Sequence, residues 1–239
     1  MEGFTFRFYF DILNKTKNLI KGGMYMKSPI KLSFGEEVAN AVTHLVPAIA
    51  VLVCMPIVSI IAYTYGTIMD VVAVTIFCIS LFFMFFVSTL YHCMPHDTPH
   101  KDVFHILDHI FIYVAIAGSY TPVALSVIKG WQAWVIIGIQ WAMVLFGILY
   151  KSLAKKSMPK VSLTIYLIMG WTAIFFFPLL MKKANPVLLS LIVAGGILYS
   201  IGAIFYAKKG FKYHHMVWHL FIVAAATCHF IGMCFFLYA

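Results

Sequence analysis

Seven apolar stretches, each close to the length that an α-helix needs to cross a bilayer, run through this chain. A helix rises about 1.5 Å per residue, so about 20 residues cross the hydrocarbon core. Hydrophobic residues occupy 63% of the 239 positions, far more than in a soluble domain. The sequence therefore predicts an integral membrane protein. The stretches lie at roughly 41–63, 70–91, 105–125, 131–150, 161–181, 187–207 and 216–238.

The stretches predict an all-α fold, a polytopic bundle of seven transmembrane helices. A transmembrane sheet would have to close into a barrel, and the alternation of polar and apolar residues that a barrel needs is absent. The connections are short, so residues 37–239 are predicted to form one domain. Residues 1–36 lack the apolar core of a signal peptide, and we expect them to be a cytoplasmic N-terminal tail.

The basic residues indicate topology rather than a partner. The net charge is +9, but the lysines do not gather into one patch, so we expect no nucleic-acid partner. With the N-terminus in the cytoplasm, 14 of the 17 Lys and Arg residues fall in cytoplasmic segments and 3 in outside ones. The positive-inside rule therefore predicts a cytoplasmic N-terminus and a C-terminus outside.

Five cysteines occur in or beside the spans, and none forms a CxxC motif. Unpatterned cysteines in apolar segments usually pack as small reduced side chains. We therefore expect free thiols and no disulfide framework.

Polar residues gather where four of the predicted spans meet the cytoplasmic face. Ionisable side chains at membrane depth are costly and usually functional. Because alternate spans run in opposite directions, these four ends lie in one layer of the membrane. The residues are Glu37, Asn40, Thr43 and His44 in the first span, Ser88 and His92 in the second, His105, Asp108 and His109 in the third, and His215 and His219 in the seventh.

The histidines of this layer have the pattern of a metal site. His215 and His219 are four residues apart, so both rings face one side of a helix. Three neutral imidazoles form a known catalytic zinc set, and His92 would be the third ligand. No glutamate lies between the pair, so a catalytic base must come from another helix. Asp108 is the candidate, because it is the carboxylate expected inside the membrane near this layer. Ser88 lies one turn from His92 and is a candidate to orient that ligand or bind the attacking water.

Each of these polar groups also has a purely structural interpretation. A lone HxxxH pattern in a helical protein often reflects packing or interfacial hydrogen bonding. Glu37, Asn40 and His44 share one helix face and are consistent with a cap and an interfacial network.

The remaining histidines are expected outside the metal layer. His105 and His109 are expected at the membrane interface. His229 lies ten residues beyond His219, roughly 15 Å deeper along a helix, and is either a buried hydrogen-bonding residue or a lining group. We expect three others to be solvated loop residues: His96, His100 and His214.

Taken together, the motifs resemble those of bacterial hemolysin III proteins over about residues 37–232. This family belongs with the progestin and adipoQ receptors and, more remotely, the alkaline ceramidases. Pro47 departs from the pattern, which favours glycine there. The motifs are Glu37-x-x-Asn40-x-x-Thr43-His44, Ser88-Thr-Leu-Tyr-His92, Leu107-Asp108, Ala117-Gly118-Ser119-Tyr120-Thr121-Pro122, Tyr166-Leu-Ile-Met-Gly170-Trp171, Gly195-Gly196-x-x-Tyr199-x-x-Gly202, His215-x-x-Trp218-His219 and His229-Phe230.

The resemblance implies a seven-helix bundle with a cytoplasmic N-terminus and Zn²⁺ held by His92, His215 and His219. Asp108 and Ser88 would surround the zinc-bound water. By analogy with the ceramidases, we expect a zinc-dependent hydrolase of lipid amides or esters in the cell (plasma) membrane, with an acyl lipid as substrate. Two alternatives remain, a receptor-like or membrane-homeostasis protein with structural zinc and a pore-forming cytolysin.

Overall fold

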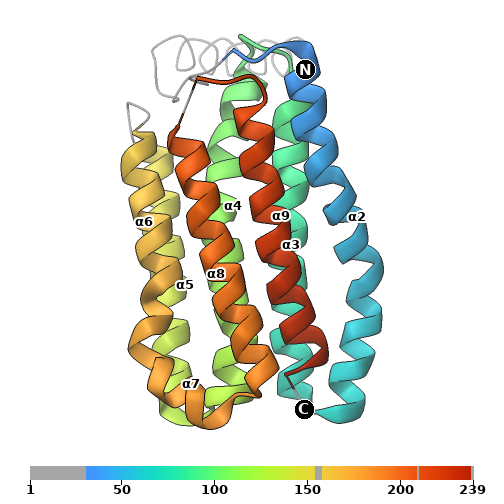
Figure 1. The fold of residues 1–239 in the computed structure, drawn as a ribbon, viewed down its shortest axis with the longest axis vertical. Helices are drawn as coiled ribbons and strands as arrows, with labels where there is room; N and C mark the ends of the chain where they lie inside the picture. Colours follow the sequence, from blue (N-terminus) through green and yellow to red (C-terminus); the bar gives the residue numbers. More distant parts are fainter. Residues whose placement is uncertain (1–30, 154–157, 209, 238–239) are drawn as a thin grey trace, which may run out of the picture.

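The computed structural model describes residues 31–153, 158–208 and 210–237, and these form an antiparallel bundle of long helices (Figure 1). Within these residues, seven helical segments are long and apolar enough to cross a membrane, so the prediction of a seven-span all-α membrane protein is confirmed. The elements are α2 (Phe34–Tyr65), α3 (Ile68–Cys93), α4 (Pro99–Pro122), η1 (Val123–Ile128), α5 (Gly130–Leu153), α6 (Pro159–Trp171), η2 (Thr172–Phe176), α7 (Phe177–Lys183), α8 (Pro186–Ala207) and α9 (His214–Phe235).

The start of the first span differs from the predicted domain boundary. Helix α2 begins at Phe34, three residues before Glu37, and the first 30 residues of the expected tail lie outside the described residues. Ser33 caps this helix, because its side chain and that of Glu36 each accept a hydrogen bond from the other residue's backbone N–H. The cytoplasmic position of the N-terminus stays a prediction.

Two of the spans change helix type near a proline. In the third span, α4 ends at Pro122 and continues as the π-helix η1. In the fifth, the 3₁₀ turn η2 joins α6 to α7, which has Pro178 in its first turn. Proline lacks the N–H for the usual helical hydrogen bond, so the backbone near it adopts other pairings.

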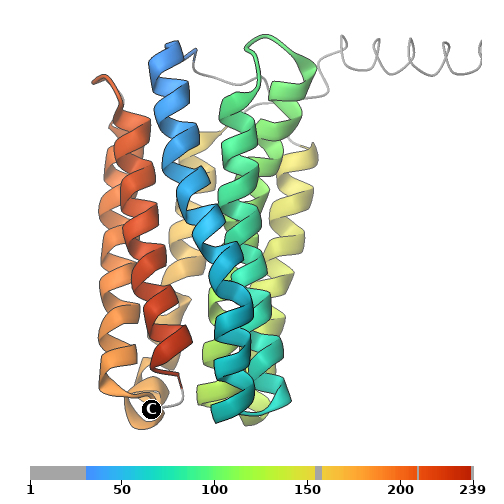
Figure 2. The ribbon, with the colours of Figure 1, turned by 90° about the vertical axis from the view of Figure 1, so that its right-hand side faces the viewer.

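Helix α3 lies in the interior of the bundle. It packs between α2 and α4, while α2 also contacts α9 and α9 lies along α8 (Figures 1 and 2). Phe77 and Cys78 of α3 are completely buried. Gly118 of α4 lies against Ser80 of α3, and a methyl group there would come within 2.5 Å of the serine Cβ. Small residues allow this close helix contact in membranes.

The outward faces of the helices are apolar. Large hydrophobic side chains are exposed along their length, for example Val53 on α2, Leu145 on α5 and Phe175 on η2. A soluble protein rarely exposes so much contiguous apolar surface, whereas a membrane protein presents it to lipid. All five cysteines are free thiols, as expected.

Candidate metal centre

Three histidines from two helices meet near one end of the bundle. His92 lies in the last turn of α3, and His215 and His219 lie in the first two turns of α9. One ring nitrogen from each lies within 4.8 Å of the others. Direct ligation at about 2.0–2.1 Å would bring these nitrogens to about 3–4 Å apart. The group could therefore hold a metal ion after a small closing movement.

The free nitrogens of these rings fit a metal. The Nε2 atoms of His92, His215 and His219 are buried, and none has a hydrogen-bond partner among the described residues. Buried polar atoms normally have a partner, so three orphaned nitrogens in one place require an explanation. A metal ion bound by three neutral imidazoles would explain them, because the lone pair of each nitrogen would then bind the ion.

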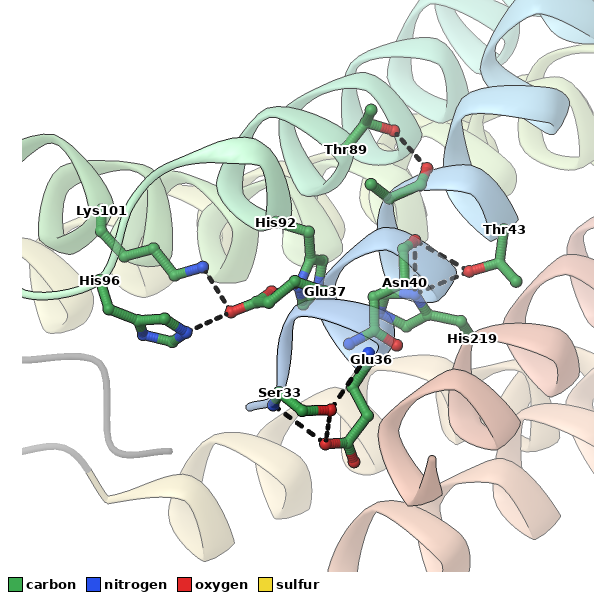
Figure 3. Close-up of polar contacts among 11 residues, drawn as sticks. Ser33, Glu36, Glu37, Asn40, Thr43, Thr89, His92, His96, Lys101 and His219 are labelled. Atoms are coloured by element: carbon green, nitrogen blue, oxygen red, sulfur yellow. Dashed lines mark hydrogen bonds and ion pairs between the residues drawn. The ribbon is translucent and has the colours of Figure 1, made fainter. Parts of the chain in front are cut away.

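Glu37 of α2 holds His92 in the orientation that ligation requires. Its Oε2 lies 2.6 Å from Nδ1 of His92 (Figure 3). A carboxylate accepts hydrogen bonds, so Nδ1 carries the proton and Nε2 keeps its lone pair for a metal. Carboxylate–histidine–metal arrangements of this kind fix the tautomer and the ring orientation of the ligand.

The other oxygen of Glu37 is bound from the loop between α3 and α4 and the first turn of α4. Nζ of Lys101 donates to Oε1 over 2.7 Å, and Nε2 of His96 lies 2.8 Å from the same oxygen (Figure 3). Lys101 is almost fully buried, with its ammonium 4.5 Å from the centre of the Tyr91 ring. The buried lysine and glutamate charges therefore compensate each other.

Helix α2 also fixes His219. Nδ1 of His219 lies 3.3 Å from the backbone oxygen of Asn40 and 3.3 Å from Oγ1 of Thr43 (Figure 3). The Asn40 carbonyl can only accept, so Nδ1 donates and Nε2 is again left as a lone pair. The ring of His44 stacks on His219 with centroids 3.6 Å apart. The polar face of the first span therefore supports the ligands.

Asp108 and Ser88, the other two residues singled out in the sequence, lie beside this group. Asp108 of α4 is buried and interacts electrostatically with His92. Ser88 lies one turn before His92, and its buried hydroxyl interacts with the Asp108 carboxylate. Neither belongs to the three-histidine group itself.

Several histidines differ from their expected environments. His100 is exposed, as expected, but His214 is buried and His96 contacts Glu37. His105 is 3% exposed and packs inside the bundle, and its expected position at the membrane interface stays a prediction. Sequence reasoning also missed that Glu37 and Lys101 pair, since it treated one as part of a cap and the other only as a topological charge. The sequence signal that could have revealed this role was an acidic residue, Glu37, in the same membrane layer as the predicted metal ligands.

A cavity extends from this layer into the bundle. It has a volume of about 500 Å³, and its lining includes Asp108 and His44 near the histidine group. Further along, its walls are mainly apolar and come from every element from α3 to α9. Cavities of this size and character take drug-sized or lipid-chain ligands.

Comparison with known proteins identifies the family of this chain. A family model described as haemolysin-III related matches residues 32–230. The chain belongs to this family. It is 37% identical to the hemolysin-3 homolog of Bacillus subtilis over 84% of this chain and 94% of that protein. It is also 38% identical to hemolysin-3 of Bacillus cereus, over 84% and 91% of the two chains.

A more distant relative is animal. The monocyte to macrophage differentiation factor of Homo sapiens is 31% identical over 65% of this chain and 66% of its own length. Membership of the haemolysin III family and the multi-pass membrane fold are therefore established for this chain.

The contact between Glu37 and His92 leads to a prediction about metal affinity. Replacing Glu37 by glutamine keeps the shape but removes the charge that holds the Nδ1 proton of His92 and pairs with Lys101. Metal affinity should fall by about 10–100-fold, the usual effect of losing such a partner. Competition with a chromogenic chelator on purified protein measures it.

Asp97→Asn is the matched control for this charge removal. Asp97 is exposed in the nearby loop and pairs only with the exposed Lys31 in the described structure. Its backbone has φ of 59°, which asparagine tolerates. Equal affinity losses in the two variants would mean that the general loss of negative charge, and not the orientation of His92, sets the affinity.

Proposed function

We propose that this protein is a zinc-dependent hydrolase that cleaves an amide or ester bond of an acyl lipid in the cell membrane. The observation that carries the proposal is a three-histidine group beside an apolar cavity, whose lining includes Asp108 and the His44 ring that stacks on His219. The ligands would be His92, His215 and His219.

The number of ligands favours a catalytic role. Structural zinc sites are usually closed by four protein ligands, whereas catalytic sites use three and leave one position for water or substrate. The group within the described residues has three histidines and no carboxylate. Glu37 is not free to become a fourth ligand, because its oxygens are bound to His92 and Lys101.

Zinc at this position would supply Lewis acidity, polarising the substrate carbonyl and making water more acidic. The carboxylate of Asp108 lines the cavity and would accept the proton that the attacking water loses. Ser88, whose hydroxyl interacts with Asp108, would also hydrogen bond to that water. Glu37, Asn40 and Thr43 would keep the two ligand rings in place throughout.

The lining of the cavity supports an acyl chain as the bound group. Side chains such as Met84, Ile112 and Ala115 form its walls beyond Asp108. An apolar chain gains free energy on entering such a space, roughly 0.8 kcal/mol for each buried methylene group. The scissile bond would then lie beside the histidine group with the chain extending along α9.

The test is turnover on a panel of amide- and ester-linked acyl lipids by purified full-length protein. We expect hydrolysis with zinc loaded, a loss of at least about 100-fold after removal by a chelator, and recovery on adding zinc back. Size-exclusion chromatography would check that the stripped protein stays folded. No turnover across the panel with zinc fully loaded would contradict the proposal and favour a receptor-like protein.

A further inference from the structure

His229 of α9 lines the cavity far from the histidine group. On α9, Trp218, Ile222, His229 and Met233 all line the cavity. Their spacing of four, seven and four residues places them on one stripe of the helix. His229 lies roughly 15 Å beyond His219 by helical rise, so it is too distant to share the metal ion.

Contacts with α8 define the protonation of the His229 ring. Its Nε2 lies 3.2 Å from the backbone oxygen of Ile192. A carbonyl oxygen only accepts hydrogen bonds, so Nε2 carries the proton and donates it. A neutral ring then has a lone pair on Nδ1, which is therefore an acceptor. Nδ1 is buried and has no hydrogen-bond partner among the residues that the structure describes.

The neighbouring helix is shaped around this ring. A Cβ added at Gly195 would overlap the Nε2 atom of His229, so only glycine leaves space for the ring there. Tyr199, one turn further along α8, contacts the ring edge-on with centroids 5.6 Å apart. The position of the His229 ring is therefore held from two sides.

An unpaired buried acceptor costs free energy unless something bonds to it. Water is a poor candidate, because a buried water needs two to four polar partners and the walls here are mainly apolar. A mainly apolar molecule with one hydrogen-bond donor would fit both Nδ1 of His229 and the apolar walls of the cavity.

We propose that Nδ1 of His229 accepts a hydrogen bond from a hydroxyl group part-way along the chain of the bound lipid. The ligand class is then an acyl lipid hydroxylated near the middle of its chain. This inference depends on the proposed function only in that a lipid chain occupies the cavity with its polar head toward the histidine group.

Binding of matched fatty acids tests it without requiring hydrolysis. The probes are stearate, its α-hydroxy derivative and its mid-chain hydroxy derivative, each competing with a fluorescent fatty acid on zinc-loaded, full-length protein. We expect the mid-chain hydroxy acid to bind about 5–10-fold more tightly than the other two, the effect of one buried hydrogen bond.

Two variants assign the preference to His229. His229→Phe keeps an aromatic ring but has no acceptor, so the ratio of its affinities for the mid-chain hydroxy acid and for stearate should fall to about one. Gly195→Ala should weaken the preference by displacing the ring. Gly138→Ala on α5 should keep it, because a Cβ there meets nothing within 4 Å and Gly138 does not line the cavity. Zinc content, unchanged in all three, would show that they are folded.

A wild-type protein that binds all three acids equally, or a preference that survives in His229→Phe, would overturn the inference while leaving the hydrolase proposal to its own turnover test. Failure of every acid to bind would also overturn it. Turnover of unhydroxylated lipids without any mid-chain preference would leave the hydrolase intact and remove His229 from substrate recognition.

Discussion

Replacing His219 by alanine is expected to reduce bound zinc from about one ion per chain to nearly none, because two imidazoles do not complete a tetrahedral protein site. The variant should also be less stable, since the ring of His44 loses its stacking partner and the Asn40 carbonyl loses a donor. Metal analysis of the purified protein, together with its thermal unfolding, measures both effects.

His100→Ala is the control for this substitution. His100 is an exposed histidine in the first turn of α4 and has no ring contact with the three-histidine group in the described structure. Its replacement should change neither zinc content nor unfolding temperature. If both variants kept the same amount of zinc, the assignment of His219 as a ligand would be refuted.

Replacing Asp108 by asparagine should separate catalysis from metal binding. Asparagine has nearly the same shape but cannot accept the proton of the attacking water. Zinc should remain bound, while lipid hydrolysis falls by about 10²–10⁴-fold, the usual contribution of a general base. Metal content and the turnover number, determined on the same preparation, test this prediction.

Each rival interpretation makes a different forecast for that experiment. If zinc is structural, thermal stability would follow zinc occupancy in both proteins and neither would hydrolyse lipids. If hydrolysis occurs but Asp108→Asn leaves it unchanged, the ion is catalytic and the base is another group. Asp102→Asn, which removes a partly buried carboxylate from the same helix outside the cavity lining, is the matched control.

The name of the bacterial relatives raises the third interpretation, a cytolytic pore. Conducting pores are lined by carbonyls, charged rings or other polar groups that replace water around an ion. The cavity that the structure describes is instead mainly apolar beyond Asp108. This lining suits a lipid chain better than a column of water.

The sequence alone determined the class of fold and the layer of the candidate site. The length and polarity of the seven stretches leave a helical bundle as the only simple solution in lipid, because backbone groups must pair within each segment. The direction of each span then places His92, Asp108 and His219 at one face. Both inferences need only the order of polar and apolar residues along the chain and the standard dimensions of a helix.

Tertiary structure decided which of the polar residues meet. The pairing of Glu37 with Lys101 joins positions 64 residues apart and depends on how α2 packs beside α3 and α4. The burial of His105 and the placement of His229 beside Gly195 depend likewise on which helix faces are opposed. A sequence shows which residues share a helix face, but the neighbour of that face is set by the packing of the whole bundle.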